Sequence, residues 1–297
     1  MEIPFNFLGI PAEYCDNQKS KVFILPVPFA GTVTFGKGTD DGPRAIIEAS
    51  KNQVEWYDEE LGVEALNIGI HTLPAVKVEK EAEATVRAVE EKVSDILALG
   101  KFPVMLGGEH SVSVGMARAL IKKYTNVSVL QIDAHSDLRN EYDFNKYSHA
   151  CAMRRVSDLG ATSFVQVGIR SQDVEEIEFL RTEQGKKHHI FCAKDIHGTD
   201  RWIDDAISKL GENVFITIDV DGFDPSIMPA TGTPEPGGLD WYTAIKLLRR
   251  VCEQKNVVGF DVVELAPIKN MHAPNFLCAR LVYKLIGYKF AKELKKV

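Results

Sequence analysis

Short runs of apolar residues alternate along the chain with longer segments in which apolar residues recur every three or four positions. The short runs are continuous and rich in β-branched residues, which is typical of strands buried on both faces of a sheet. They predict strands at Val22–Pro26, Leu66–Ile70, Phe102–Leu106, Val127–Asp133, Phe164–Ile169, His189–Cys192, Val214–Asp219 and Val258–Val263. The amphipathic segments predict helices, most clearly at Glu79–Leu99, Ser111–Tyr124, Asp173–Gln184, Leu239–Gln254 and Asn275–Leu294.

This alternation of strands and helices predicts an α/β fold with a mostly parallel sheet flanked by helices. No linker, repeat or low-complexity segment interrupts the pattern, so we expect a single domain over residues 1–297. The pattern alone does not distinguish an open three-layer sheet from a closed barrel. In both architectures, functional residues lie at the carboxyl ends of the strands.

The composition is that of an ordinary globular protein, with 45% hydrophobic and 26% charged residues. The formal net charge of −7 gives no electrostatic support for binding to nucleic acid or to an anionic membrane. The five cysteines are scattered and form no Cys-x-x-Cys pair, which argues against a disulfide framework and against a thiolate zinc site. With no signal-peptide pattern and no apolar run long enough to span a membrane, we expect a cytoplasmic protein.

Potential metal ligands follow three of the predicted strands. One strand ends in the sequence DAHSD at 133–137, another in DVD at 219–221, and a third in GGEH at 107–110. Alternate residues of an extended chain point in the same direction, and parallel strands end at the same edge of a sheet. We therefore expect six side chains to converge there, namely His110, Asp133, His135, Asp137, Asp219 and Asp221.

Four carboxylates in one cleft repel each other at neutral pH unless their pKa values rise or cations compensate for them. Two divalent ions balance four negative charges, so the pattern predicts a binuclear metal site. A donor set of carboxylates and imidazoles without a thiolate suits Mn²⁺, with Co²⁺, Ni²⁺ and Fe²⁺ as alternatives. Two neighbouring ions lower the pKa of a water between them, which predicts metal-assisted hydrolysis. The chain has no GxSxG and no P-loop, which disfavours a serine hydrolase and a nucleoside triphosphatase.

Several ordered motifs resemble those of the ureohydrolases, the arginase/agmatinase superfamily: GGEHS (107–111), DAHSD (133–137), DVDGFDPSIMPATGTPEPGG (219–238) and DVVELAP (261–267). The segments FGKGTDDGPRAIIEAS (35–50) and QVEWYDEELG (53–62) are similar to the agmatinase branch, so the resemblance covers nearly the whole chain. It implies a three-layer α/β/α fold around an eight-stranded, mostly parallel sheet, and thus an open sheet. It also implies a pair of Mn²⁺ ions in each subunit and a homo-oligomer, either a trimer or a hexamer.

The resemblance also implies which residues hold the metals. One ion would be held by His110, Asp133, Asp137 and Asp219. The other would be held by Asp133, His135, Asp219 and Asp221, so that Asp133 and Asp219 bridge the pair. Asp224, in DGFDP, resembles a family aspartate that supports the loop and is not a ligand.

Three residues are expected to take part in the reaction on a guanidine substrate. Glu264 matches the family's guanidinium-binding glutamate, and a carboxylate suits the fork of donors on that planar cation. His149, in YSHACAMRR, matches the histidine that passes a proton to the leaving amine, a task that suits a group titrating near neutral pH. Asp137 is expected to accept a hydrogen bond from the nucleophile. The other histidines, interpreted as surface or core residues, are His71, His188, His189, His197 and His272.

The substrate tail is the least constrained feature. Arginases bind the α-carboxylate of their substrate through an asparagine and a serine in the loop after the second metal-binding aspartate. In the corresponding loop of this chain, LRNEYDFNKYS (138–148), Arg139 stands where that asparagine would lie. Glu141 and Asp143 of the same loop suit a terminal ammonium group. We therefore predict an agmatinase, which hydrolyses agmatine to putrescine and urea in polyamine biosynthesis. The alternatives within the same chemistry are aminopropylagmatine, guanidinobutyrate or another guanidino acid, and arginine. Outside it, the alternatives are a dimetal phosphoesterase and a metal-binding protein without catalysis.

Overall fold

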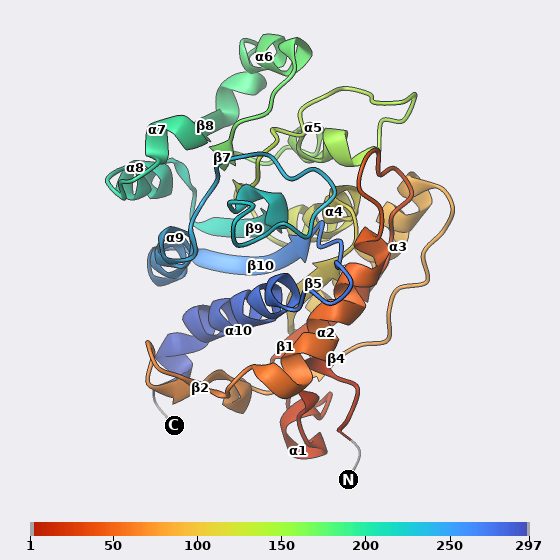
Figure 1. The fold of residues 1–297 in the computed structure, drawn as a ribbon, viewed down its shortest axis with the longest axis vertical. Helices are drawn as coiled ribbons and strands as arrows, with labels where there is room; N and C mark the ends of the chain where they lie inside the picture. Colours follow the sequence, from red (N-terminus) through yellow and green to blue (C-terminus); the bar gives the residue numbers. More distant parts are fainter. Residues whose placement is uncertain (1–2, 296–297) are drawn as a thin grey trace.

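The structure, a computed structural model, describes residues 3–295 apart from the side chains of Asn52 and Gln53. Its main feature is an eight-stranded sheet in the order β4-β1-β5-β10-β9-β6-β7-β8, in which all neighbouring strands are parallel (Figure 1). The strands of this sheet are β1 Val22–Val27, β4 Ile70–Thr72, β5 Phe102–Gly107, β6 Val127–Ile132, β7 Phe164–Ile169, β8 His188–Cys192, β9 Asn213–Asp219 and β10 Asn256–Val263. A separate antiparallel pair is formed by β2 Tyr57–Asp58 and β3 Val63–Glu64.

Helices cover both faces of the sheet. The α-helices are α1 Ala12–Cys15, α2 Gly42–Gln53, α3 Ala82–Ala98, α4 Ser113–Lys123, α5 Ala152–Asp158, α6 Val174–Leu180, α7 Ala193–Ile196, α8 Trp202–Lys209, α9 Trp241–Gln254 and α10 Ala273–Leu294. Shorter 3₁₀ helices are η1 Phe7–Gly9, η2 Thr39–Asp41, η3 Ala65–Ile68, η4 His110–Val112, η5 His149–Cys151, η6 Gly185–Lys187 and η7 Val220–Gly222. Among the described residues, no helix has the length and apolar character needed to cross a membrane.

Alternate side chains of each strand pack into two separate hydrophobic cores, one on each face of the sheet. In β1, Val22 and Ile24 join the core formed with α2, α8, α9 and α10, whereas Phe23 and Leu25 join the core formed with α3, α4 and α5. The two layers of helices are visible on either side of the sheet in Figure 1. The expected three-layer α/β/α fold is therefore confirmed, and the barrel alternative is wrong because β4 and β8 are unpaired edges of the sheet.

The structure differs from the expected elements in several places, and the shorter elements α1, α5, α7, α8, β2 and β3 were not among those expected. The apolar run that begins at Leu66 forms the 3₁₀ helix η3, and the strand starts only at Ile70, because Gly69 turns the chain with a φ of +79° where a Cβ would meet Ser20 at 2.7 Å. The helix expected at Asp173–Gln184 ends at Leu180. Helix α2 was not expected, although Pro43 stands in its first turn, where proline is favoured.

The carboxyl ends of four neighbouring strands, β5, β10, β9 and β6, form one continuous stretch of the sheet edge. Each strand is followed at once by a polar segment of the predicted site. His110 follows β5, Glu264 follows β10, Asp219 ends β9, and Asp133 follows β6. Gly108 makes the turn after β5 possible, because a Cβ there would lie 2.0 Å from the carbonyl oxygen of Phe29.

Candidate metal and guanidine site

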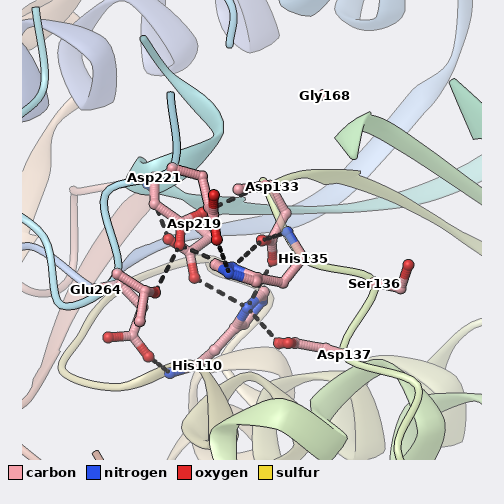
Figure 2. A network of polar contacts seen from close by, with 12 residues as sticks. His110, Asp133, His135, Ser136, Asp137, Gly168, Asp219, Asp221 and Glu264 are labelled. Atoms are coloured by element: carbon pink, nitrogen blue, oxygen red, sulfur yellow. Dashed lines mark hydrogen bonds and ion pairs between the residues drawn. The ribbon is translucent and has the colours of Figure 1, made fainter. Parts of the chain in front are cut away.

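All six side chains expected to bind metal lie together at this edge of the sheet (Figure 2). Two groups of donor atoms lie close enough to share an ion, one made by His110, Asp133 and Asp219 and the other by Asp133, His135 and Asp221. Asp133 belongs to both groups, as expected for a residue that bridges two ions. The cleft above them, of about 220 Å³, is also lined by Asp137, His149 and Glu264.

The ring of His110 shows how well this donor set fits a cation. Its Nδ1 is buried and has no hydrogen-bond partner in the part of the chain that the structure describes, yet carboxylate oxygens of Asp133, Asp137 and Asp219 lie 3.1, 3.0 and 3.4 Å away. Its other nitrogen, Nε2, lies 2.9 Å from the hydroxyl of Thr217, which fixes the plane of the ring. An imidazole nitrogen aimed at three carboxylates is the arrangement that a divalent ion would complete.

The second group of donors is held by its own backbone. The amide of His135 donates to Asp133 over 2.6 Å, and the amide of Asp221 donates to Asp219 over 2.9 Å. The Nδ1 of His135 lies 3.0 Å from a carboxylate oxygen of Asp221 and 3.6 Å from one of Asp133. These short turns aim the carboxylates and the imidazole into one space, so the donors require little rearrangement to bind an ion.

The electrostatics of the cluster show that it needs compensating positive charge. Burial, together with the charge of Asp133, raises the pKa of Asp137 to about 7. Burial and the charges of Asp221 and Asp133 raise the pKa of Asp219 well above its ordinary value. Burial opposes a charge on His135, but the carboxylates of Asp133 and Asp221 raise the pKa of its ring to about 12. Without cations the carboxylates must share protons, and with cations they need none.

Glu264 and Asp137 have strained backbones, with φ values of +67° and +54°. Such conformations are costly for residues other than glycine and cluster at functional sites. One oxygen of Glu264 accepts a hydrogen bond from the backbone N–H of His110 over 2.7 Å. Burial, and then the charge of Glu109, raise the pKa of Glu264 well above its ordinary value. The carboxyl group is thus held beside the donor cluster, where a cationic partner would stabilise its ionised form.

His149 begins η5, in the segment that follows the 138–148 loop, and lines the same cleft. Burial, and then the charge of His135, lower the pKa of His149 to about 4. The ring is therefore neutral at pH 7 and can accept a proton. Its Nδ1 lies 3.2 Å from the hydroxyl of Thr32, while no hydrogen-bond partner within the described residues is recorded for Nε2.

The side chains that orient Asp133 were not identified from the sequence. Gln131 donates its amide to Asp133 over 2.6 Å and accepts a hydrogen bond from Gln166. Gln166 in turn lies 2.8 Å from Nδ1 of His188, whose ring stacks on Phe164 with centroids 4.0 Å apart. The interpretation of His188 as a core residue is correct, and its ring also belongs to a buried chain of hydrogen bonds that runs from Ser157 to the shared Asp133.

We expect Gln166→Leu to weaken the binding of Mn²⁺ by about 10- to 100-fold, because partners behind a ligand contribute on this scale to metal affinity. The substitution changes none of the proposed ligands, but it breaks the chain between Gln131 and His188 and removes the hydrogen bond from Gln166 to the carbonyl oxygen of Ser136. Titration calorimetry of metal-free protein measures the affinity, and the exposed Gln254→Leu is the matched control. Equal affinities in the two variants would show that the chain does not orient Asp133.

Asp261, in β10 below the site, is fully buried, and neither of its carboxylate oxygens has a hydrogen-bond partner among the described residues. Burial raises its pKa to about 6. The folded protein then holds this proton more tightly than the unfolded chain does, so the stabilising effect is complete at low pH and is lost as the pH rises from about 4 to about 6.

We therefore expect Asp261→Asn to increase the free energy of unfolding at pH 8 by about 2–3 kcal/mol more than it does at pH 4, since the variant cannot ionise. Chemical unfolding of metal-free wild type and variant at both pH values provides the comparison. If the substitution does not increase the free energy of unfolding at pH 8, or increases it more at pH 4 than at pH 8, then ionisation of buried Asp261 does not destabilise the folded protein.

The arginine by which the 138–148 loop lines the cleft, Arg139, is not free to bind a carboxylate substrate. Arg139 forms an ion pair with Asp173 at 3.1 Å, and its guanidinium lies 5.1 Å from the ring centroid of Tyr142. Asp173 and Glu176 line the same end of the cleft, where Glu176 accepts a hydrogen bond from the backbone of Leu138. The charge of Arg139 is already matched, and this end favours a cationic tail over an anionic one.

Comparison with known proteins agrees with this geometry. The family model described as the arginase family matches residues 20–287. The N(1)-aminopropylagmatine ureohydrolase of Synechocystis is 37% identical over an alignment that covers 100% of both chains. The protein of the same name from Thermus thermophilus is 38% identical, covering 92% of this chain and 91% of its own.

Among solved structures, the agmatine ureohydrolase of Thermoplasma volcanium superposes with a TM-score of 0.85 at 33% identity. The match covers 96% of this chain and 95% of the other. The similarity in sequence and in fold thus extends over nearly the whole length of both proteins.

Proposed function

The chain belongs to the arginase family, whose ureohydrolases cleave the C–N bond of guanidino compounds, and we propose that its substrate is N1-aminopropylagmatine. Hydrolysis of this compound releases urea and leaves the triamine spermidine. The sequence alone favours agmatine, with aminopropylagmatine as an alternative. The names of the two relatives at 37% and 38% identity support the alternative, whereas agmatine is named for the solved structure at 33% identity.

The single observation that carries the choice of a polyamine tail is the charge at the open end of the cleft. Arg139 is paired with Asp173, and the partly exposed carboxylate of Glu235 lies 4.0 Å from Nε2 of His135. Aminopropylagmatine carries two ammonium groups beyond its guanidinium, and agmatine carries one. An acidic rim with no unmatched arginine suits both of them better than arginine or guanidinobutyrate.

We propose that the cluster holds two Mn²⁺ ions. His110 and Asp137 would be ligands of the first ion, and His135 and Asp221 of the second, with Asp133 and Asp219 shared between them. The support is the unpartnered Nδ1 of His110 and the membership of Asp133 in both donor groups. When bound, the two cations supply a hydroxide from water at neutral pH and neutralise the four carboxylates.

The remaining roles fall to side chains of this chain. Glu264 accepts hydrogen bonds from the guanidinium and keeps its carbon over the metal cluster. Asp137 accepts a hydrogen bond from the attacking water and so orients it. His149, neutral at pH 7, takes up one proton of the water and passes it to the departing nitrogen, so that the C–N bond breaks. The remaining hydroxyl proton is released as the C=O bond of urea forms, and it ends on the amine, so the positive charge of the guanidinium leaves as an ammonium group.

The test is urea release from N1-aminopropylagmatine, agmatine, guanidinobutyrate and arginine by Mn²⁺-loaded protein. We expect kcat/KM to be highest for aminopropylagmatine, and activity to disappear with a chelator and return when Mn²⁺ is added again. A higher value for agmatine would make the protein an agmatinase. No urea from any of the four, or turnover of a chromogenic phosphoester, would overturn the proposal.

A further inference from the structure

We propose that Thr32 and Glu109 are positioning residues that fix the tautomer of His149, so that Nδ1 carries the permanent hydrogen and Nε2 is the atom that takes up and releases the proton. The inference rests on the proposed role of His149 and deepens it. The three residues come from the loop after β1, the turn after β5 and the start of η5. They meet beside the cleft through a continuous set of hydrogen bonds.

Glu109 is the fixed end of this set. Its side chain is fully buried and accepts three hydrogen bonds, each of 2.6 Å. Two come from Thr32, one from its backbone N–H and one from its hydroxyl, and the third comes from the hydroxyl of Ser111. The bonds from the backbone and the side chain of Thr32 together hold this residue in one orientation.

The direction of the hydrogen bond to His149 follows from the single hydrogen of a hydroxyl group. When Glu109 is ionised it can only accept, so Thr32 gives its one hydroxyl hydrogen to Glu109 and the hydroxyl oxygen can only accept from other partners. Two groups of His149 approach that oxygen, the backbone N–H at 3.0 Å and Nδ1 at 3.2 Å. Nδ1 must therefore be the protonated nitrogen of the neutral ring.

Nε2 is then left as the basic nitrogen. His149 lines the cleft, and the described residues offer Nε2 no recorded hydrogen-bond partner. The charged groups that act on the ring are His110, His135 and Asp133 across the cleft, with Glu109 behind Thr32. The ring centroids of Tyr142 and His149 lie 6.2 Å apart in an edge-to-face arrangement, and the hydroxyl of Ser148 lies 3.5 Å from Nδ1. The proton taken from water thus binds at Nε2 and leaves from Nε2.

The test compares Thr32→Val, which keeps the shape and removes the hydroxyl, with Thr32→Ser, which keeps the hydroxyl. Thr162→Val, at a distant exposed threonine whose hydroxyl donates to the carbonyl of Val127, controls for loss of a hydroxyl elsewhere. We expect Thr32→Val to lower kcat about 10- to 100-fold with little change in KM or in bound metal, since orientation of a proton-transfer group acts on this scale. Thr32→Ser should stay close to wild type.

A second readout does not depend on turnover. The ¹⁵N signals of His149 in protein loaded with diamagnetic Zn²⁺, assigned by their absence from His149→Asn, report which nitrogen carries the hydrogen. We expect the Nδ1–H form in wild type and Thr32→Ser, and its loss in Thr32→Val. An Nε2–H form in wild type, or equal kcat values for the valine and serine variants, would overturn the inference. A wild type that shows the Nδ1–H form but releases no urea would instead overturn the proposed function.

Discussion

Replacing Asp219 with asparagine is expected to reduce urea release by at least ~10³-fold under saturating Mn²⁺, the scale on which a central electrostatic group contributes to catalysis. Asp219 lies at the carboxyl end of the β9 strand, 3.4 Å from the ring of His110. An asparagine can still accept the hydrogen bond from the backbone of Asp221, so the turn is kept. The charge that would join the two ions is lost.

The same substitution is expected to have the opposite effect on stability when metal is absent. Burial and the charges of Asp221 and Asp133 raise the pKa of Asp219, so the ionised group opposes folding in the metal-free protein. Asp219→Asn should therefore unfold at a higher temperature than wild type in the presence of a chelator, and at a lower temperature in the presence of Mn²⁺.

Thermal unfolding of both proteins with and without Mn²⁺ measures this reversal. Asp224→Asn is the matched control, because Asp224 follows the same strand but accepts a hydrogen bond from the backbone of Ser226 and lies outside both donor groups. A variant that is less stable than wild type under both conditions would contradict the view that cations compensate the buried charge of Asp219.

Replacing Glu264 with glutamine is expected to lower kcat/KM by about 10²- to 10⁴-fold, which corresponds to the loss of one partner of a buried ion pair. Glutamine keeps the shape of the side chain and still accepts the hydrogen bond from the amide of His110. It lacks the negative charge that a guanidinium requires. Since Glu264 is not among the proposed metal ligands, the variant should bind the same amount of Mn²⁺ as wild type.

Steady-state kinetics and metal analysis of the same preparations check this prediction, with the exposed Glu212→Gln as the control. If Glu264→Gln loses activity in proportion to its loss of bound Mn²⁺, then Glu264 stabilises the metal site and does not bind the substrate. Unchanged kinetics with the metal in place would exclude contact between Glu264 and the substrate.

The parts of the fold that the sequence predicts well are those in which one local signal dominates. The run at Val214–Asp219 is apolar, continuous and followed by charged residues, and it lies in a strand at the centre of the sheet. The segment from Leu66 also carries apolar residues but forms a 3₁₀ helix that ends at the turn of Gly69, and the first turn of this helix bonds to the hydroxyl of Tyr283 in α10. That contact is distant in sequence, so no local pattern contains it.

The same distinction applies to the site. The six predicted ligands converge because strand direction and a spacing of two residues are local properties that parallel pairing brings to one edge. Gln131, Gln166 and Thr32 carry no such signal, since an isolated amide or hydroxyl beside a strand is common. Glu109 lies within a recognised motif, but its three donors become apparent only when the loop after β1 is in place.

The number of divalent ions that bind each chain tests the central claim most directly. Titration calorimetry with Mn²⁺ on metal-free protein, combined with elemental analysis of the saturated sample, measures it. The account predicts two ions per chain, and fewer than two when Asp133 or Asp219 is replaced by asparagine. Saturation of well-folded wild-type protein at a single ion, or at none, would contradict it.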